Sequence, residues 1–235
     1  GAETKKRRFG SATVRPYRQS PCFLIHVNLP EKCFARVRHL SFFADMTVLQ
    51  TDLPKLTIRN KQLLPIVQGG MGVGISAHRL AGNVARLGGM GTISSVDLRR
   101  HHPDLMVQTG DSRDKDAINA ANLVALDREI RAAKALSQGS GMVAVNIMRA
   151  VADYAAYVRQ SCESGADAIV VGAGLPMDLP ELAADFPNVA LIPILSDVRG
   201  IGLILKKWMR RDGLPDAIVI ENPRYAAGHL GAATI

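Results

Sequence analysis

A short apolar strand followed by an amphipathic helix recurs along most of this chain, and this repeat constrains the fold more than any other feature. We predict strands at residues 65–68, 90–94, 142–147, 168–172, 190–195 and 217–221. Their first residues lie 25, 52, 26, 22 and 27 positions apart, which leaves room for a helix after each strand. Strands that alternate with helices at this spacing form βα units, and such units build a parallel α/β sheet.

One interval is twice the usual length and indicates an insertion. Residues 99–116 are polar and rich in turn formers, and we predict a helix from about Ala117 to Leu136 after them. A long insertion at a strand end is typical of a lid or an entrance wall. His101 and His102 lie in it without a carboxylate or cysteine partner at helical spacing, so we expect a solvated loop and no metal site.

The first repeat, residues 64–97, has the clearest turn and helix-capping residues. A glycine-rich turn at 69–74 allows a ligand to approach the backbone closely, because glycine has no Cβ. We predict Ser76 as the N-cap of the next helix and Leu80, Val84 and Leu87 as its buried face. A helix N-terminus beside such a turn favours an anion or cofactor site.

Small and hydrogen-bonding residues follow every predicted strand. In parallel α/β folds ligands bind at the carboxyl ends of the strands, so these residues would line one common site. Glycines give close approach and amides give orientation, a combination that suits a flat ring system. The candidate lining residues are Gln68, Gly69, Gly70, Met71, Ser94, Asn146, Gly172, Gly174 and Gly228.

His229 is the strongest candidate for a catalytic residue. It stands beside Gly228 and close to Gly231, so its imidazole lacks shielding neighbours in the sequence. An imidazole titrates near neutral pH and can therefore move a proton during catalysis. We predict His229 as the catalytic residue.

A dinucleotide-binding fold competes for the same turn. Residues 72–77 match the pattern G-x-G-x-x-A, and Asp97 lies 20 positions beyond Ala77, near the place of a ribose-binding acid. In that fold, however, the first fingerprint glycine follows its strand directly, and here three residues intervene. The continued repeat through six strands favours a barrel, while an NAD-dependent Rossmann dehydrogenase stays an alternative.

The motifs at the strand ends resemble those of the nitronate monooxygenases, formerly called 2-nitropropane dioxygenases. The resemblance extends from about residue 58 to 233 and rests on PIVQGGMG, GMGTISS, VNIM, VVGAGLP and AGHLG. It implies a (β/α)8 TIM-type barrel that holds FMN non-covalently at the carboxyl ends of its strands. It also implies oxidation of an alkyl nitronate with O2 to a carbonyl compound and nitrite.

Residue by residue, the resemblance assigns roles to several of the candidates. Gly69, Gly70 and Met71 would lie beside the flavin ring, and Asn146 would hydrogen-bond it. Gly172 and Gly174 would line the pocket, while His229 would act as a base or orient the nitro group. The chain departs from the family at Ala227, where a glycine is common.

The number of repeats is a second departure. Six strands correspond to about six βα units, and the chain ends just after the histidine motif. The phosphate site of such barrels comes from the loops after strands seven and eight. We therefore expect an incomplete barrel that binds FMN weakly. An FMN-dependent enoyl-ACP reductase of the same frame, and a non-catalytic fragment that pairs through its sheet edge, stay alternatives.

Charge and composition limit the partners. Residues 1–45 contain nine Lys and Arg against three acidic residues, whereas residues 46–235 contain 20 against 18. The surplus of +8 therefore belongs mainly to this basic extension, which we place outside the domain formed by 46–235, and nucleic-acid binding is not expected. No apolar run is long enough for a membrane span. Three cysteines without pairing or metal spacing favour a cytoplasmic location. A homo-oligomer stays open.

Overall fold

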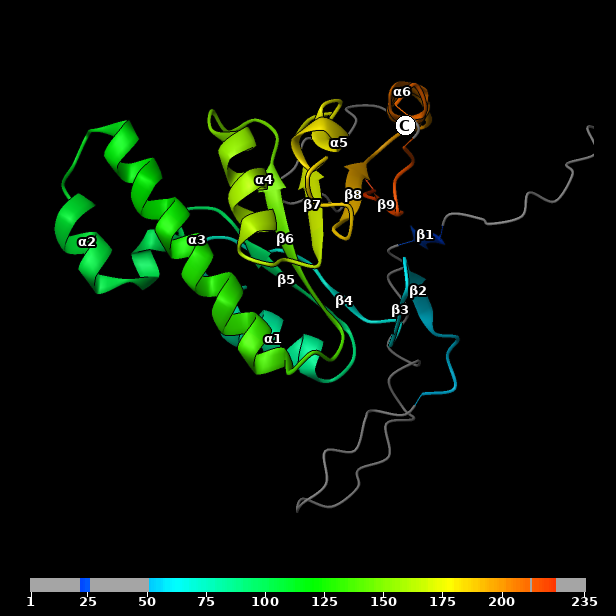
Figure 1. Ribbon diagram of the computed structural model, residues 1–235, viewed down its shortest axis with the longest axis horizontal. Coiled ribbons are helices and arrows are strands. Elements are labelled where there is room, and N and C mark those ends of the chain that lie inside the picture. Colours follow the sequence, from blue (N-terminus) through cyan, green and yellow to red (C-terminus); the bar gives the residue numbers. More distant parts are fainter. Residues whose placement is uncertain (1–21, 26–50, 212, 223–235) are drawn as a thin grey trace, which may run out of the picture.

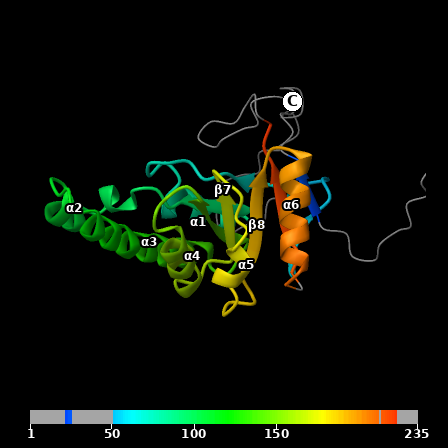
Figure 2. The ribbon, with the colours of Figure 1, turned by 90° about the horizontal axis from the view of Figure 1, so that it is seen from above.

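A curled parallel sheet with helices on its outer face forms the body of the molecule (Figures 1 and 2). The computed structural model describes residues 22–25, 51–211 and 213–222. The strands of the sheet are β4 (Val67–Gln68), β5 (Met90–Ser94), β6 (Met142–Met148), β7 (Ala168–Gly172), β8 (Ala190–Leu195), β9 (Ala217–Ile220) and β1 (Cys22–Ile25). The α-helices are α1 (His78–Arg86), α2 (Pro103–Thr109), α3 (Lys115–Ser137), α4 (Tyr154–Glu163), α5 (Leu179–Leu182) and α6 (Val198–Met209).

The order of the strands confirms the predicted fold class. From β4 to β9, strands that are neighbours in the sequence are also neighbours in the sheet, and every pair is parallel. This sequential, curled arrangement is that of a (β/α)8 barrel represented by six of its βα units. A Rossmann sheet instead reverses its strand order at a switch point, and the described strands contain no such reversal.

Alternating residues divide the core into two layers. Inward-facing residues such as Met142, Ala144, Ala168 and Val170 form the interior cluster of the half-barrel. The intervening residues, Val143 and Val145 among them, pack outward beneath the helices. Period-two alternation places successive side chains on opposite faces of a strand. Strands buried on both faces explain the nearly continuous apolar runs in the sequence.

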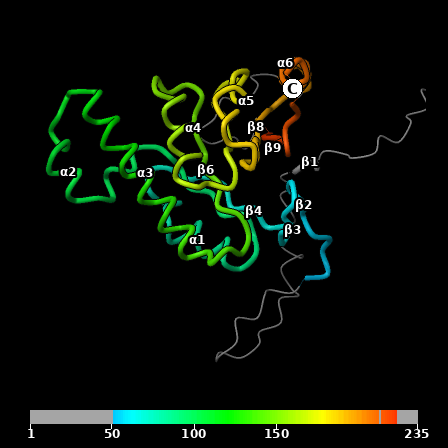
Figure 3. Tube along the Cα trace, in the orientation of Figure 1, coloured from blue at the N-terminus to red at the C-terminus, as the bar shows by residue number. Residues whose placement is uncertain are grey.

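A hairpin closes the amino-terminal end of the half-barrel. β2 (Leu56–Ile58) pairs antiparallel with β3 (Lys61–Leu63). Ile58 and Leu63 are buried against the first residues of the barrel strands, including Met90 and Ala217. The trace in Figure 3 leads from this hairpin directly into β4.

Two carboxylates fasten the hairpin to the sheet. Asp167 precedes β7, accepts hydrogen bonds from Lys61 Nζ at 3.0 Å and Lys134 Nζ at 2.8 Å, and also accepts one from the Val143 N–H at 2.8 Å. Asp216 precedes β9 in the same way, accepting from the Leu191 N–H and pairing with Arg59, each at 2.8 Å. Burial alone would raise the pKa of Asp167, but these donors outweigh it and hold the pKa below its usual value.

The first helix differs from its prediction in both its cap and its buried face. The N-cap position is Ala77, while the Ser76 hydroxyl accepts from the Met71 N–H at 2.7 Å and so fastens the glycine turn. The buried residues of α1 are Ala81, Gly82 and Ala85, whereas Leu80 is 36% exposed and Leu87 47% exposed. The predicted apolar face is therefore wrong, because α1 lies too close to its neighbours for large side chains.

That close approach involves glycines on two elements, α1 and β5. A Cβ on Gly82 would lie 2.8 Å from the Leu136 Cβ and 3.0 Å from the Ala133 carbonyl oxygen of α3. A Cβ on Gly91 of β5 would lie 2.6 Å from the Ala81 carbonyl carbon. Small residues thus allow α1 to pack against both the sheet and α3.

The insertion is partly helical. A 3-10 helix at Leu98–His101 and α2 precede α3, which matches the predicted helix to within two residues at each end. Arg99 is buried and donates from Nη1 to the Thr109 carbonyl oxygen at 3.1 Å and to its hydroxyl at 3.0 Å. Figure 2 shows α2 and the adjacent part of α3 extending away from the sheet.

Part of the basic extension lies beside the sheet. β1 pairs parallel with β9, with Cys22 opposite Ala217 and Ile25 opposite Ile220. The sequence did not predict this strand. Because the remainder of residues 1–45 lies outside the described residues, the placement of the extension outside the domain stays a prediction. Among the described residues, no helix combines the length and apolarity needed to cross a membrane.

Candidate functional site at the carboxyl ends of the strands

The glycine-rich turn after β4 passes over the ends of β5 and β6. A Cβ on Gly70 would lie 2.5 Å from the Cβ of Asn146 and 3.0 Å from its side-chain carbonyl carbon. A Cβ on Gly72 would lie 3.2 Å from the Ser94 hydroxyl oxygen. Ser94 and Asn146 are themselves opposite each other in the β5–β6 register. The structure therefore brings four residues of the predicted strand-end set and turn together at one edge.

Asn146 presents its side-chain amide at this edge. It occupies an inward-facing position on β6, after Met142 and Ala144, and is 6% exposed. Within the described ranges, its side-chain amide makes no hydrogen bond, although its backbone oxygen accepts from the Ser95 N–H at 3.1 Å. An amide held between the turn and the sheet without a partner is suited to bind a ligand that has both donors and acceptors.

Gln68 uses its side chain differently. Its amide nitrogen donates to the Thr92 carbonyl oxygen, and its amide oxygen accepts from the Thr92 N–H, each at 3.1 Å. The side chain thereby continues the pairing of β4 with β5 where the backbone of β4 turns away. Gln68 lies beside the candidate site, and its side chain stabilises the edge of the sheet.

The outer side of the turn is open and apolar. Apart from Gly69 and its two chain neighbours, no described residue has an atom within 4 Å of the position that a Cβ on Gly69 would take. Met71 is 42% exposed, and Ile66, Val73 and Ile75 of the same segment are also exposed. Exposed apolar side chains gathered on one segment are typical of a surface that binds a ligand or another part of a protein.

The two glycines after β7 lie farther along the same edge. Gly172 is opposite Met148 in the register, and its carbonyl oxygen accepts from the Arg149 N–H at 2.8 Å. Gly174 has φ +130°, and a Cβ there would lie 3.2 Å from the Arg149 Cβ. The structure thus places both at the end of β7. His229 and Gly228 lie outside the described residues.

His102 of the insertion and His78 of α1 both lie against one buried carboxylate. Glu129 of α3 lies 2.7 Å from His78 Nδ1 through Oε2 and 3.1 Å from His102 Nε2 through Oε1. In the described part of the chain, no cluster of three potential ligand residues is arranged to hold a metal ion. The prediction of a solvated loop is wrong for His102, because this residue pairs with Glu129 inside the fold.

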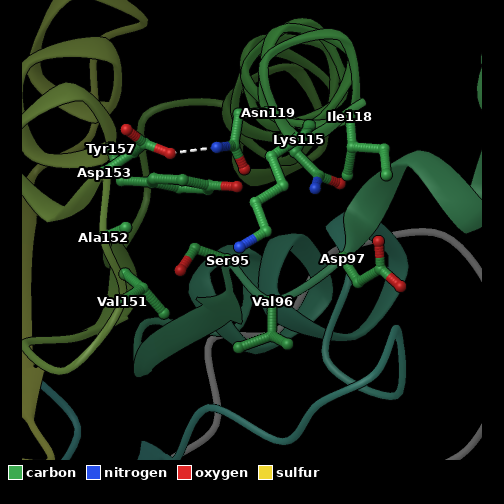
Figure 4. Close-up of a pocket in the computed structure, with 11 residues that line it drawn as sticks. Ser95, Val96, Asp97, Lys115, Ile118, Asn119, Val151, Ala152, Asp153 and Tyr157 are labelled. Carbon is green, nitrogen blue, oxygen red and sulfur yellow. Dashed lines mark hydrogen bonds between the residues drawn. The ribbon is translucent and has the colours of Figure 1, made fainter. Parts of the chain in front are cut away.

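A pocket of about 340 Å³ opens next to this edge, on the helical side of the sheet. Figure 4 shows it between the loop after β5, the start of α3 and the loop after β6. Its lining residues are Ser95, Val96, Asp97, Lys115, Ile118, Asn119, Asn122, Val151, Ala152, Asp153 and Tyr157. Sequence reasoning considered Asp97 for a ribose and missed the others, although the long insertion indicated that this strand end was unusual.

The acidic groups of this pocket are already engaged. Asp97 accepts from Arg99 Nε at 2.9 Å and also pairs with Arg100. Burial raises the pKa of Asp97, but the two guanidinium groups outweigh it, so the net effect lowers the pKa. Asp153 accepts a hydrogen bond from the Asn119 amide, drawn in Figure 4. Burial, reinforced by the Asp153 carboxylate, raises the pKa of Tyr157 to about 12, so its hydroxyl stays protonated.

Comparison with known proteins gives one matching family and several similar solved structures. The model of the family "Nitronate monooxygenase" matches residues 55–235. FabK from Thermotoga maritima superimposes with a TM-score of 0.48 and 20% identity, over 71% of this chain and 42% of FabK. Nitroalkane oxidase from Streptomyces ansochromogenes gives a TM-score of 0.29 and 14% identity, over 66% of this chain and 64% of the oxidase. This chain thus spans less than half the length of FabK. A comparison with curated proteins found no match.

Proposed function

Because this chain belongs to the nitronate monooxygenase family, we propose that it oxidises alkyl nitronates with O2 and uses FMN as its cofactor. The products are a carbonyl compound and nitrite. The single observation that supports this proposal best is the arrangement of Gly69, Gly70 and Asn146, where a glycine turn lies against an amide at the carboxyl end of β6 that has no partner among the described residues.

The residues of this edge fit a flat ring. The open space over Gly69 and the absence of a Cβ let a ring lie directly on the backbone. The Asn146 amide supplies one donor and one acceptor in the same place, which suits the alternating donors and acceptors of an isoalloxazine. Exposed Met71 adds an apolar contact beside it.

The flavin, when bound, supplies the redox chemistry, and the residues of the chain position the reactants. Asn146 holds the ring in one orientation, and Ser94 presents a hydroxyl next to it. Gly172 and Gly174 leave room for the substrate at the end of β7. His229 takes or holds a proton of the substrate, or orients its nitro group, at near-neutral pH.

A substitution at Gly69 tests the ring site without damaging the fold. Because no described residue other than its chain neighbours has an atom within 4 Å of the new Cβ, Gly69→Ala is accommodated by the protein but occupies the space proposed for the ring. Gly202→Ala is the matched control, since its new Cβ also meets no atom of the described residues within 4 Å outside its own helix backbone and chain neighbours, and it lies on α6. FMN titration followed by flavin fluorescence gives a dissociation constant for each variant.

We expect Gly69→Ala to weaken FMN binding at least tenfold while its melting temperature and that of the wild type agree. Gly202→Ala should bind FMN as the wild type does. Nitrite release and O2 uptake with a nitronate should require FMN and should disappear in His229→Ala. Equal FMN affinity of Gly69→Ala and wild type, or flavin-independent nitrite release, would refute the proposal.

A further inference from the structure

The pocket beside the strand ends is separated from the proposed ring site by a single layer of backbone. Ser94 takes an inward position on β5, and the next residue, Ser95, lines the pocket on the other side. The Ser95 N–H donates to the Asn146 carbonyl oxygen at 3.1 Å, which joins the two sites at this layer. A ligand in the pocket would therefore lie at the functional end of the sheet but outside the barrel interior.

Two donors in this pocket have no partner among the described residues. Lys115, the first residue of α3, makes neither an ion pair nor a hydrogen bond through its ammonium group within those ranges. The Ser95 hydroxyl likewise makes no hydrogen bond there, although the residue is only 3% exposed. Figure 4 shows the Lys115 side chain crossing the pocket with its nitrogen directed toward Ser95.

The surroundings of these donors are apolar or already bonded to other residues. Val96, Ile118 and Val151 form the walls with the ring of Tyr157. Asp97 is turned to Arg99 and Arg100, so its charge does not oppose an incoming anion. The Asp153 carboxylate is bonded to Asn119 on the other side of the pocket, as Figure 4 shows.

We propose that this pocket binds a small aliphatic carboxylate. Its carboxylate accepts hydrogen bonds from Lys115 Nζ and Ser95 Oγ, and its alkyl chain contacts Val96, Ile118 and Val151. A volume of about 340 Å³ is sufficient for a chain of a few carbons. This assignment requires no flavin and is independent of the proposed oxidation.

The donor set favours a monoanion over a phosphate. Phosphate sites combine several backbone N–H groups or a bidentate arginine with their cation, and this pocket offers one ammonium and one hydroxyl. A carboxylate has two oxygens, which these two donors satisfy. The apolar walls exclude a small hydrated anion as the best occupant, because they would remain uncovered.

Hexanoate is a suitable probe, and hexanamide is its neutral counterpart of nearly equal shape. The purified chain is titrated with each compound by calorimetry, together with variants whose melting curves show that they are folded. Lys115→Met removes the charge and keeps the apolar stem, and Lys206→Met, at an exposed position of α6, is its matched control. Ala152→Phe fills the pocket from an exposed position, and Ala155→Phe, exposed on α4 outside the pocket, is its control.

We expect hexanoate to bind at one site and at least tenfold more tightly than hexanamide, since charge-assisted hydrogen bonds are the stronger kind. Lys115→Met should lose at least tenfold in hexanoate affinity and little in hexanamide affinity. Ala152→Phe should abolish binding of both, whereas Lys206→Met and Ala155→Phe should bind like the wild type. Absence of saturable hexanoate binding, equal affinity for the two probes, or unchanged binding in Lys115→Met would overturn the proposal.

Discussion

Gly91 lies where the backbone of α1 crosses β5, and replacing it by alanine tests the close packing of this helix. The new Cβ would lie 2.6 Å from the carbonyl carbon of Ala81 and 2.7 Å from its Cα, and closer still to its carbonyl oxygen. All three are backbone atoms, so no side-chain rotation relieves the clash. The whole helix or the strand has to move.

The size of this movement determines how much stability the Gly91→Ala variant loses. Non-bonded carbon atoms are normally about 3.5–4.0 Å apart, so α1 must shift by roughly 1 Å at this point. Its other side is blocked, because Gly82 already lies against Ala133 and Leu136 of α3. Inserting a methyl group into a packed core costs about 1–3 kcal/mol, and we expect Gly91→Ala to lie at the upper end of this range.

Replacing Gly202 by alanine should instead increase the stability of the protein. Outside its own helix backbone and chain neighbours, no atom of the described residues lies within 4 Å of its Cβ position on α6, so alanine adds no clash and restricts the unfolded chain. We expect a gain of about 0.5–1 kcal/mol from helix propensity. Urea unfolding is followed by the fluorescence of Trp208, which is 1% exposed and is the one tryptophan of the chain.

With a urea m-value of about 2–3 kcal/mol/M, the midpoint of Gly91→Ala should fall by roughly 1 M. The midpoint of Gly202→Ala should rise slightly. If both variants unfold at the wild-type midpoint, α1 does not pack against β5 as closely as the structure shows, and the argument from small residues fails.

Two further predictions concern ionisable groups. The folded-state pKa of Asp167 is lowered, so its contribution is present above the unfolded pKa of about 3.9 and is lost as the pH falls through the folded pKa. Asp167→Asn should therefore lower the free energy of unfolding by about 2–4 kcal/mol at pH 7, a loss kept moderate because the two lysine partners are 39% and 32% exposed. The difference in unfolding free energy between wild type and variant should shrink below pH 4. A constant difference from pH 7 to 3 would contradict this. Burial raises the pKa of the Cys162 thiol to about 11, so at pH 8 iodoacetamide should alkylate it at least tenfold more slowly in the folded chain than in urea, measured on its peptide by mass spectrometry; equal rates would show that the thiol is accessible.

The strands could be predicted because each is a short apolar run between turn residues. β5 and β7 coincide with their predictions, and β6 extends one residue beyond the predicted end. α1 could not be predicted in detail, since its buried face consists of Ala81, Gly82 and Ala85, and hydropathy favours leucine and valine. Tertiary proximity selected small residues there, a choice that only the three-dimensional packing explains.

The candidate site was predictable in part. The carboxyl-end rule located Gly70, Ser94 and Asn146 correctly at one edge, because strand register brings equivalent positions together. The same rule could not show that Gln68 uses its amide to extend the sheet. The second pocket was missed, since its residues come from three segments, around 95, 115–122 and 151–157, that no spacing in the sequence connects.

The hairpin at the amino-terminal end has a consequence for cooperativity. Its Lys61 reaches Asp167 across 106 positions of sequence, and its Arg59 reaches the Pro187 carbonyl oxygen across 128. Each contact closes a loop of more than a hundred residues, and the entropic cost of this closure is much smaller when β7, β8 and β9 are already in place. The hairpin therefore connects distant parts of the chain, and we expect it to unfold cooperatively with β7, β8 and β9.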